Sequence, residues 1–400
     1  MKFMAAVSIA ALTCGVSAVA GDWSAWRGPN QDGITAEKVS PQADFTKPVW
    51  QARIGAGYSA VSVYQGKLLA AGNSKIDGKE TDTIYCLDAK TGKEIWKYSY
   101  ECSNAGGFPG PRGTPVTDGT NVYLLSRTGL LNCLSLADGK NVWTVNIMQA
   151  HGAQNLQWCF GSSVVIKGDR IYINAGAHGM AFEKATGKAV WANEGGLGNY
   201  ATPVLFSCKG KDYVAVFSGK KFHVVNEKDG REVASVDWVT KYNINACDAM
   251  VMANGTKIFV ASGYDKASAV LDFDGQTLKP LWKNQNLGMQ FNTPVLINGL
   301  LYGANGNTGG GKLRAVDCKT GEAKWDSQLG FGSLLYAGGT LVYMEEKGTL
   351  SLITPNADQS QVVKTVPIFQ GGKSWTMPVL ANGLLYLRHD SGDLRCYKVD

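Results

Sequence analysis

Charged residues are scarce in this 400-residue chain: Asp, Glu, Lys and Arg together make up 18% of it, and the formal net charge is +6. Lys and Arg are spread among the acids without a basic run, so the composition gives no support to a nucleic-acid-binding protein. One apolar stretch near the start is too short to span a bilayer, and no other run approaches the ~18 apolar residues of a membrane helix. We therefore expect no nucleic acid partner and no transmembrane segment.

Several motifs of catalysis and metal binding are missing as well. The sequence has no C-x-x-C, no adjacent Cys-Cys, no C-x-x-C-H haem signature and no G-x-S-x-G nucleophile motif. Its four His (151, 178, 223 and 389) are too dispersed for H-x-H or H-E-x-x-H. If the fold brings two of them together, we expect the pair to be His151 and His178, and we predict no metal site.

Glycine, in contrast, is abundant. It accounts for 49 of 400 residues, about 12% against an average of ~7%. The 12 Pro are scattered and no G-X-Y period is present, so a collagen-like chain is excluded. With 44% hydrophobic residues the chain can bury a full core, and a turn-rich β-protein is favoured.

The first 20 residues have the pattern of a secretory signal peptide. Lys2 supplies a positive charge, residues 5–16 are apolar or small, and Ala18-Val19-Ala20 is an A-x-A cleavage pattern before Gly21. We predict cleavage after Ala20 and a periplasmic or secreted protein.

A repeat of about 45 residues dominates the remaining sequence. The segment DAKTGKEIW (88–96) returns five times in related forms, and its turn glycines are 43 to 48 residues apart. A second marker, T-P-V or a looser copy, precedes each set of short alternating apolar runs. A period of about 40–50 residues with four strands is typical of a propeller blade. The turn glycines are Gly92, Gly139, Gly187, Gly230, Gly275 and Gly321.

Blade starts near residues 58, 113, 161, 201, 248, 292, 332 and 376 predict an all-β, eight-bladed propeller of four-stranded antiparallel blades over residues 46–400. The eighth blade stops before its fourth strand, and the segment 46–55 is expected to supply that strand. Residues 21–45 form an N-terminal extension. Once-per-blade tryptophans are predicted to be packing anchors between blades: Trp50, Trp96, Trp143, Trp191, Trp282 and Trp325.

Eight cysteines follow the predicted signal peptide. Cys86, Cys133 and Cys396 occupy equivalent places in three repeats, where small buried residues belong. Cys102 and Cys159 fall in loops of neighbouring repeats and are the one pair that we predict as a possible disulfide in an exported protein.

The repeat LDAKTGKEIW with its T-P-V marker resembles the pyrroloquinoline-quinone (PQQ) repeat of the quinoprotein alcohol dehydrogenase-like propellers, a family that includes PQQ-dependent dehydrogenases and BamB-like exported proteins. The segment DWSAWRGPNQDGI (22–34) is similar to the N-terminal segment of exported bacterial members. The resemblance implies a non-catalytic binding or scaffold module of the periplasm or cell envelope, or alternatively a PQQ-dependent alcohol or sugar dehydrogenase.

The enzymes of this family hold the quinone against a Cys-Cys disulfide and beside Ca²⁺. Because Cys-Cys is absent here, we expect no cofactor, and PQQ with Ca²⁺ only under the dehydrogenase alternative. Asp248 is the one acid that we nominate for catalysis; alternatively, it has a structural role as a turn cap or blade-start residue.

The long loops of one face are rich in Asn, Gln, Tyr and Trp and poor in acids, which suits a polar ligand such as a glycan or a peptide strand of an envelope protein. We expect the protein to be a monomer. The predicted ligand-binding residues on this face are Arg112, His151, Gln157, Trp158, His178, Asn199, Tyr200, Tyr242, Asn245, Gln290, Asn292, Trp375 and Arg388.

Overall fold

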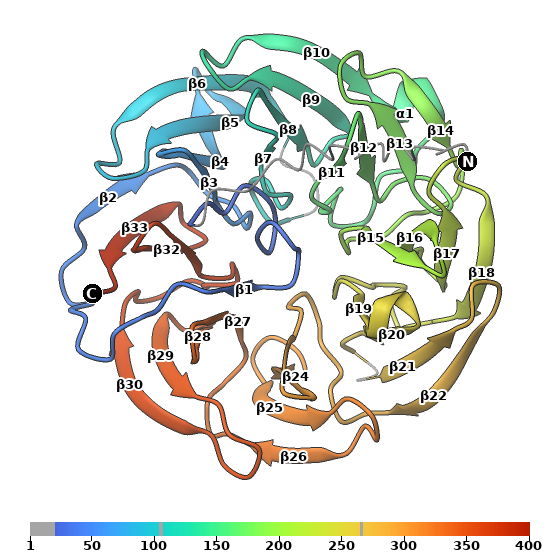
Figure 1. Ribbon diagram of the computed structural model, residues 1–400. Helices are drawn as coiled ribbons and strands as arrows, with labels where there is room; N and C mark the ends of the chain where they lie inside the picture. Colours follow the sequence, from blue (N-terminus) through green and yellow to red (C-terminus); the bar gives the residue numbers. More distant parts are fainter. Residues whose placement is uncertain (1–20, 104–106, 265–266) are drawn as a thin grey trace, which may run out of the picture.

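Within the residues that the computed structural model describes (21–103, 107–264 and 267–400), eight sheets surround a central axis like the blades of a propeller (Figure 1). The predicted signal peptide lies outside the described residues. Each blade has four antiparallel strands in the expected order, with its first repeat strand at the axis and its fourth at the rim, and one blade gains a fifth strand that is described below. The predicted fold class is therefore confirmed.

Blades 1 to 4 follow one another along the chain. Their strands are, blade by blade, β3 (Ser62–Tyr64), β4 (Lys67–Ile76), β5 (Lys79–Asp88) and β6 (Glu94–Glu101); β7 (Val116–Thr117), β8 (Asn121–Leu125), β9 (Leu130–Ser135) and β10 (Asn141–Asn146); β11 (Val165–Lys167), β12 (Arg170–Ile173), β13 (Met180–Glu183) and β14 (Ala189–Ala192); β15 (Val204–Cys208), β16 (Lys211–Phe217), β17 (Lys221–Asn226) and β18 (Glu232–Asp237).

Blades 5 to 8 complete the ring. Their strands are β19 (Met250–Met252), β20 (Lys257–Ala261), β21 (Ser268–Phe273) and β22 (Leu278–Asn284); β23 (Val295–Ile297), β24 (Leu300–Asn305), β25 (Lys312–Asp317) and β26 (Ala323–Asp326); β27 (Gly332–Ala337), β28 (Thr340–Glu345), β29 (Thr349–Thr354) and β30 (Gln361–Pro367); β31 (Val379–Ala381), β32 (Leu384–Arg388), β33 (Asp393–Lys398) and β2 (Trp50–Arg53). Two short helical turns, α1 (Ile147–His151) and a 3-10 turn (Ala253–Gly255), lie between strands.

The last blade is closed by the N-terminal strand, as predicted. Strand β2 pairs antiparallel with β33, with Trp50 opposite Cys396 and Arg53 opposite Asp393. This pairing covers the outer edge of β33 and joins the two ends of the described chain.

The predicted tryptophan anchors pack between neighbouring blades. The indole of Trp96 in blade 1 lies against the turn glycine of blade 2, Gly139, and its Nε1 donates to the carbonyl of Leu136 at 3.0 Å. Trp50, Trp143, Trp191 and Trp282 make the same contact with the turn glycine of the next blade and donate to the carbonyl three residues before it. Trp325 packs, partly buried, in the cluster shared by blades 6 and 7.

The cysteines of equivalent repeat positions are buried directly opposite these indoles. Cys86 faces Trp96 across the β5–β6 pair, and Cys133 faces Trp143 in blade 2. The predicted disulfide is not formed: Cys102 and Cys159 are both buried thiols. The Sγ of Cys102 instead lies 3.7 Å from the Thr128 hydroxyl, close to the buried ion pair of Asp82 and Arg127.

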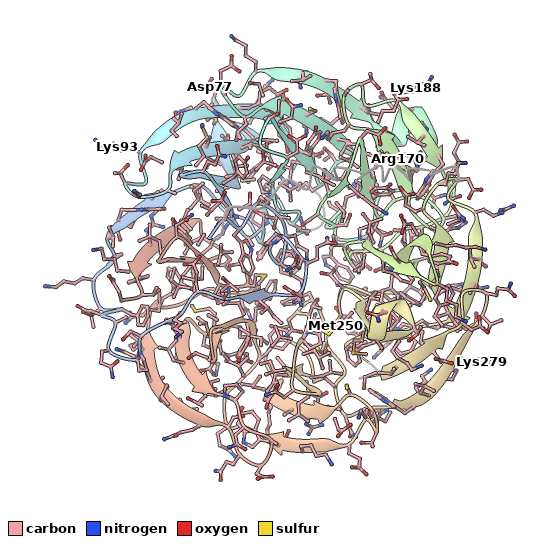
Figure 2. All side chains as sticks on the ribbon, in the orientation of Figure 1. Asp77, Lys93, Arg170, Lys188, Met250 and Lys279 are labelled. Atoms are coloured by element: carbon pink, nitrogen blue, oxygen red, sulfur yellow. The ribbon has the colours of Figure 1, made fainter. Side chains whose placement is uncertain are left out.

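Lysines cover the rim of the propeller. Lys93, Lys188 and Lys279 are exposed and project outward from three different blades (Figure 2). Lys93 and Lys188 follow the turn glycines, so the rim at these turns is charged and solvated. Among the described residues no helix is both long and apolar enough to cross a membrane.

The N-terminal extension runs across the inner strands and is part of the propeller. Strand β1 (Ile34–Thr35) pairs in parallel with β27, which gives blade 7 a fifth strand, and Trp23 forms an antiparallel bridge with Val63 of blade 1. Arg27 is 2% exposed, and its Nη1 and Nη2 donate to the carbonyls of Thr293 and Pro294 at 3.0 and 2.8 Å. This segment therefore supplies the floor of the central channel.

Candidate functional site

One position of the repeat contributes a ring of residues to the wall of a central cavity. The position lies three residues before the Pro of the T-P-V marker, where the chain enters the innermost strand. The cavity has a volume of about 280 Å³, slightly below the ~300–1,000 Å³ that is usual for small-molecule sites. Seven blades contribute this residue to its lining: Tyr58, Arg112, Gly161, Tyr200, Ala246, Phe291 and Trp375.

A chain of hydrogen bonds beneath this position fixes the blades to one another. The residue two places further along accepts, through its side chain, from a backbone N–H of the preceding blade. Five such bonds of 2.7 to 3.1 Å connect blades 1 to 6, so the cavity wall rests on a rigid frame. In order, the bonds run from Ala60 N to Thr114 Oγ1, Thr114 N to Ser163 Oγ, Ser163 N to Thr202 Oγ1, Thr202 N to Asp248 Oδ1, and Asp248 N to Thr293 Oγ1.

Asp248 belongs to this frame and also holds the floor of the cavity. Its Oδ1 accepts from Thr202 N at 2.7 Å, and its Oδ2 accepts from Nε1 of Trp26 at 2.6 Å. The carboxyl is 5% exposed, and burial raises its pKa, an effect that the nearby Arg27 guanidinium opposes. Both oxygens are thus already engaged in holding a blade start and the indole of the N-terminal extension.

Aromatic rings cover one side of the cavity. The ring of Trp375 lies 5.2 Å from Tyr58, 5.0 Å from Phe291 and 5.9 Å from Phe108, measured between centroids. Tyr58 and Phe108 meet edge to face at 6.0 Å. We call these four residues the aromatic wall; they come from loops and strand starts of blades 8, 1 and 6. Such ring clusters present a large, stiff apolar surface.

Small residues and one cation occupy the same repeat position in the blades opposite. Gly161 and Ala246 leave the space that the cavity fills, because larger side chains at the equivalent places close it elsewhere. Arg112 donates from Nη1 to Gly110 O and from Nη2 to Phe108 O, each at 3.0 Å, and lies 6.0 Å from the Tyr58 ring. The cavity therefore combines an apolar wall with one guanidinium.

The structure brings part of the predicted ligand-binding set together here. Five of the predicted ligand-binding residues line the cavity: Arg112, Trp158, Tyr200, Gln290 and Trp375. Asp248, the nominated acid, lines it as well. Trp158 and Tyr200 pack against each other with ring centroids 6.5 Å apart. Gln290 is tied by its Nε2 to the hydroxyl of Tyr264 at 3.0 Å.

Three predicted amides are buried in the framework. The carboxamide of Asn199 donates to Asn243 O and accepts from the backbone N–H of Asn245. Asn245 donates to Ser218 O at 3.0 Å, and Asn292 donates to Gly332 O at 2.6 Å. Because these bonds join neighbouring loops and blades, the three amides position the loops and do not line the cavity.

Arg388 is also outside the cavity lining. It is 3% exposed and donates through Nη1 to the carbonyl and hydroxyl of Ser59. Burial lowers the pKa of its guanidinium to about 9. Its Nε has no partner among the described residues.

Four other predicted residues lie elsewhere on the loop face. Gln157 is exposed, and Tyr242 is 50% exposed with its ring edge to face with Tyr264. The expected His151–His178 pair is wrong. His151 lies beside Glu194 and the ring of Phe182, whereas His178 stacks on His223 of the following blade at 5.3 Å.

Sequence reasoning missed most of the aromatic wall and the floor. Phe291 could have been found as the residue three places before the Pro of its T-P-V marker, and Trp375 confirms that register. Tyr58 could have been found by aligning blade 1, where Val61 stands in place of that Pro, with the other blades. Trp26 carries no such signal, because its place depends on where the extension crosses the channel.

Comparison with known proteins agrees with this architecture. A family model described as outer membrane protein assembly factor BamB matches residues 80–327 and 222–357. The chain belongs to this family. BamB from Moranella endobia is 26% identical over 333 residues, which cover 77% of this chain and 80% of that protein.

Two solved structures show that the BamB-family fold extends over nearly all of the chain. BamB from Moraxella catarrhalis is similar with a TM-score of 0.62 at 16% identity, covering 88% of this chain and 97% of that one. Quinohemoprotein alcohol dehydrogenase from Comamonas testosteroni has a TM-score of 0.70 at 12% identity, covering 96% and 81%. At these identities the two likenesses establish the fold alone.

Proposed function

We propose that this BamB-family chain is a non-catalytic binding module of the periplasm or cell envelope, which holds an aromatic or large apolar side chain of an envelope protein in its central cavity. The single observation that carries this proposal is the aromatic wall facing a gap at Gly161 and Ala246. The predicted signal peptide and the name of the BamB relatives, which are assembly factors for outer membrane proteins, support the location and the kind of partner.

The polar groups of the cavity favour a peptide side chain over a glycan. The hydroxyls of Ser163 and Thr202 and the carboxylate of Asp248 line the cavity, and each already accepts a hydrogen bond from a backbone N–H of the neighbouring blade. A sugar would bring many hydroxyls to this surface and leave part of them without partners, which costs free energy. An apolar side chain needs no hydrogen-bond partner in the cavity, and a peptide carbonyl beside it could accept a hydrogen bond from Arg112.

The residues of the cavity do not fit PQQ with Ca²⁺. Calcium takes six to eight oxygen ligands, usually with several carboxylates. Among the described residues that line the cavity, Asp248 alone has a carboxylate, and both of its oxygens accept short hydrogen bonds from the protein. The dehydrogenase alternative is therefore the weaker proposal, and we derive no step through the quinone.

The binding proposal is tested with Trp375→Ala. Immobilised wild-type protein, the variant and a matched control, Leu281→Ala, are incubated with envelope extract, and retained proteins are identified by mass spectrometry. Leu281 is 54% exposed on the outer strand β22, far from the loop face. Loss of a central aromatic anchor costs about 2 kcal/mol or more, roughly a thirtyfold weaker affinity.

We expect one or a few envelope proteins to be enriched by wild type and by Leu281→Ala, and to be lost with Trp375→Ala. Equal retention by Trp375→Ala, or no enrichment over an unrelated propeller, contradicts the proposal. In a parallel test, protein incubated with PQQ and Ca²⁺ is assayed for quinone absorbance and for dye reduction with alcohols and aldoses. Stoichiometric quinone binding with turnover would establish the dehydrogenase instead.

A further inference from the structure

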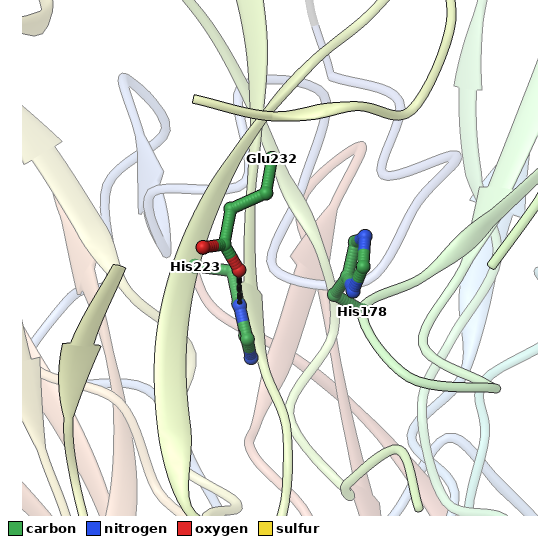
Figure 3. Close-up of side chains that lie close together, drawn as sticks. All are labelled: His178, His223 and Glu232. Atoms are coloured by element: carbon green, nitrogen blue, oxygen red, sulfur yellow. Dashed lines mark hydrogen bonds and ion pairs between the residues drawn. The ribbon is translucent and has the colours of Figure 1, made fainter. Parts of the chain in front are cut away.

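A second group of chemistry-bearing side chains lies between blades 3 and 4, away from the cavity. His178 is in the turn that joins β12 to β13, His223 is on β17, and Glu232 is on β18 (Figure 3). One ligand atom of each lies within 4.8 Å of the other two. Figure 3 shows His178 beside the hydrogen-bonded His223–Glu232 pair.

Both ring nitrogens of His223 have hydrogen-bond partners. Its Nε2 lies 2.9 Å from Oγ of Ser218. That hydroxyl also lies 3.3 Å from the carbonyl of Lys221 and accepts from the Lys221 N–H at 3.2 Å. Because a hydroxyl can donate or accept, Ser218 can support either tautomer of the neutral ring, including the one with Nε2 protonated and a lone pair on Nδ1.

The other nitrogen of His223 faces a carboxylate. Nδ1 lies 2.6 Å from Oε2 of Glu232. Without a metal ion, a proton on Nδ1 joins the two atoms, and the Ser218 hydroxyl then donates to Nε2. A metal ion that takes the place of this proton would meet the nitrogen lone pair and the carboxylate oxygen together, while Nε2–H donates to Ser218.

The surroundings orient the other two groups. The hydroxyl of Ser235 donates to Oε1 of Glu232 at 2.9 Å and leaves Oε2 directed at His223. The half-buried ring of His178 is stacked on that of His223, with 5.3 Å between their centroids. Bonds such as those of Ser218 to His223 and of Ser235 to Glu232, on the far side of a ligand, are the usual support of metal sites in proteins.

We propose that His178, His223 and Glu232 bind one divalent transition-metal ion such as Zn²⁺, with water as the fourth ligand, and that the ion ties blade 3 to blade 4. Two imidazoles and a carboxylate with an open fourth position are a common zinc ligand set. With bonds of about 2.0–2.1 Å, tetrahedral ligand atoms lie about 3.4 Å apart. Here the ligand atoms lie within 4.8 Å of one another and the His223–Glu232 contact is 2.6 Å, so binding requires His178 to approach the pair and the pair to open slightly.

The test uses tag-free, metal-stripped protein and three variants. Zn²⁺ binding is measured by calorimetry, and Co²⁺ binding by the visible absorption of a tetrahedral site. Wild type should take up one ion per chain, while His178→Ala and Glu232→Gln should each bind at least about a hundredfold more weakly. Ser218→Ala should lose about tenfold, the effect expected of an indirect support.

A second histidine–carboxylate pair provides the matched control. His151 lies 3.7 Å from Glu194 on the same face, so Glu194→Gln removes a comparable carboxylate and should leave metal binding unchanged. The substituted positions in the two ligand variants are half-buried or exposed, so both should fold, which circular dichroism checks. Zn²⁺ should raise the melting temperature of wild type and not of His178→Ala. Absence of stoichiometric binding, or equal affinity in wild type, His178→Ala and Glu232→Gln, overturns the proposal.

Discussion

The contact between each anchor tryptophan and the next blade's turn glycine leads to a quantitative prediction. In wild type, a Cβ placed on Gly139 would lie 2.5 Å from Cε3 of Trp96, about 1 Å inside the ordinary carbon–carbon contact distance. The indole cannot withdraw without breaking its bond to Leu136 O. Gly139→Ala therefore adds overpacking of about 1–3 kcal/mol to the backbone cost of a left-handed alanine, about 1–2 kcal/mol.

Blade 5 supplies the matched control. Its turn glycine, Gly275, also has a positive φ, +98° against +71° at Gly139, but the preceding blade has Ala234 where six other blades have Trp. A Cβ on Gly275 would meet nothing closer than 3.8 Å. Gly275→Ala should therefore show only the backbone cost of about 1–2 kcal/mol.

The free energy of unfolding is measured by guanidinium denaturation followed by circular dichroism, with variants compared at equal m-value. In a Trp96→Ala background, Gly139→Ala should lose its packing penalty, so that the double variant departs from additivity by about 1–3 kcal/mol. Equal destabilisation by Gly139→Ala and Gly275→Ala, or a penalty at Gly139 that persists without the indole, would refute the proposed blade contact.

Three further outcomes are expected. Asp82→Asn should lower the free energy of unfolding by about 3–5 kcal/mol, because the Arg127 guanidinium then stays buried beside a neutral amide. The same denaturation measures this loss. The control Glu80→Gln, on the same strand, should change the free energy of unfolding by less than about 0.5 kcal/mol. Burial raises the pKa of Asp248 above 3.8, although Arg27 opposes this effect. The folded state therefore binds this proton more tightly than the unfolded state, and the free energy of unfolding of the wild type should fall as the pH rises just above 3.8. Asp248→Asn should remove this pH dependence from unfolding curves. Cys318 is half-buried whereas the other seven described cysteines are buried, so Ellman's reagent should label this thiol before any other in the native protein, at a rate below that of a free thiol because burial raises its pKa. In Cys318→Ser this first phase should be absent, and several thiols that react as early would contradict the packing.

Much of the fold follows from local sequence, and the reason is the repeat. The turn glycines and the tryptophans that pack on them recur because each blade meets the next in the same way, so Trp50 at the start of the chain could be assigned to the last blade. The fifth strand of blade 7 could not be predicted, since β1 is two residues long and its pairing depends on the path of the extension across the channel.

The candidate site was predicted less well for a geometric reason. Loop composition indicates which face is rich in polar and aromatic residues, but it does not say which side chains point to the axis. Asn199 and Asn245 have the residue type of ligand-binding groups, yet they join loops to one another. The stacking of His178 on His223 depends on the contact of a turn in one blade with a strand of the next, which no spacing along the chain encodes.

The pairing of β2 with β33 bears on the order in which the protein is made. Of the four strands of blade 8, translation produces β2 first and β33 last, so Trp50 has no opposite neighbour, Cys396, until seven blades have been synthesised. Until then the inner blades have neighbours on both sides, but the first and the last each expose a face that the completed ring covers. A ribosome that stops just before β33 thus releases an open arc with unpaired strand edges, which are prone to aggregate. Deletion of the six residues of β33 should therefore reduce the yield of folded protein far more than their number suggests.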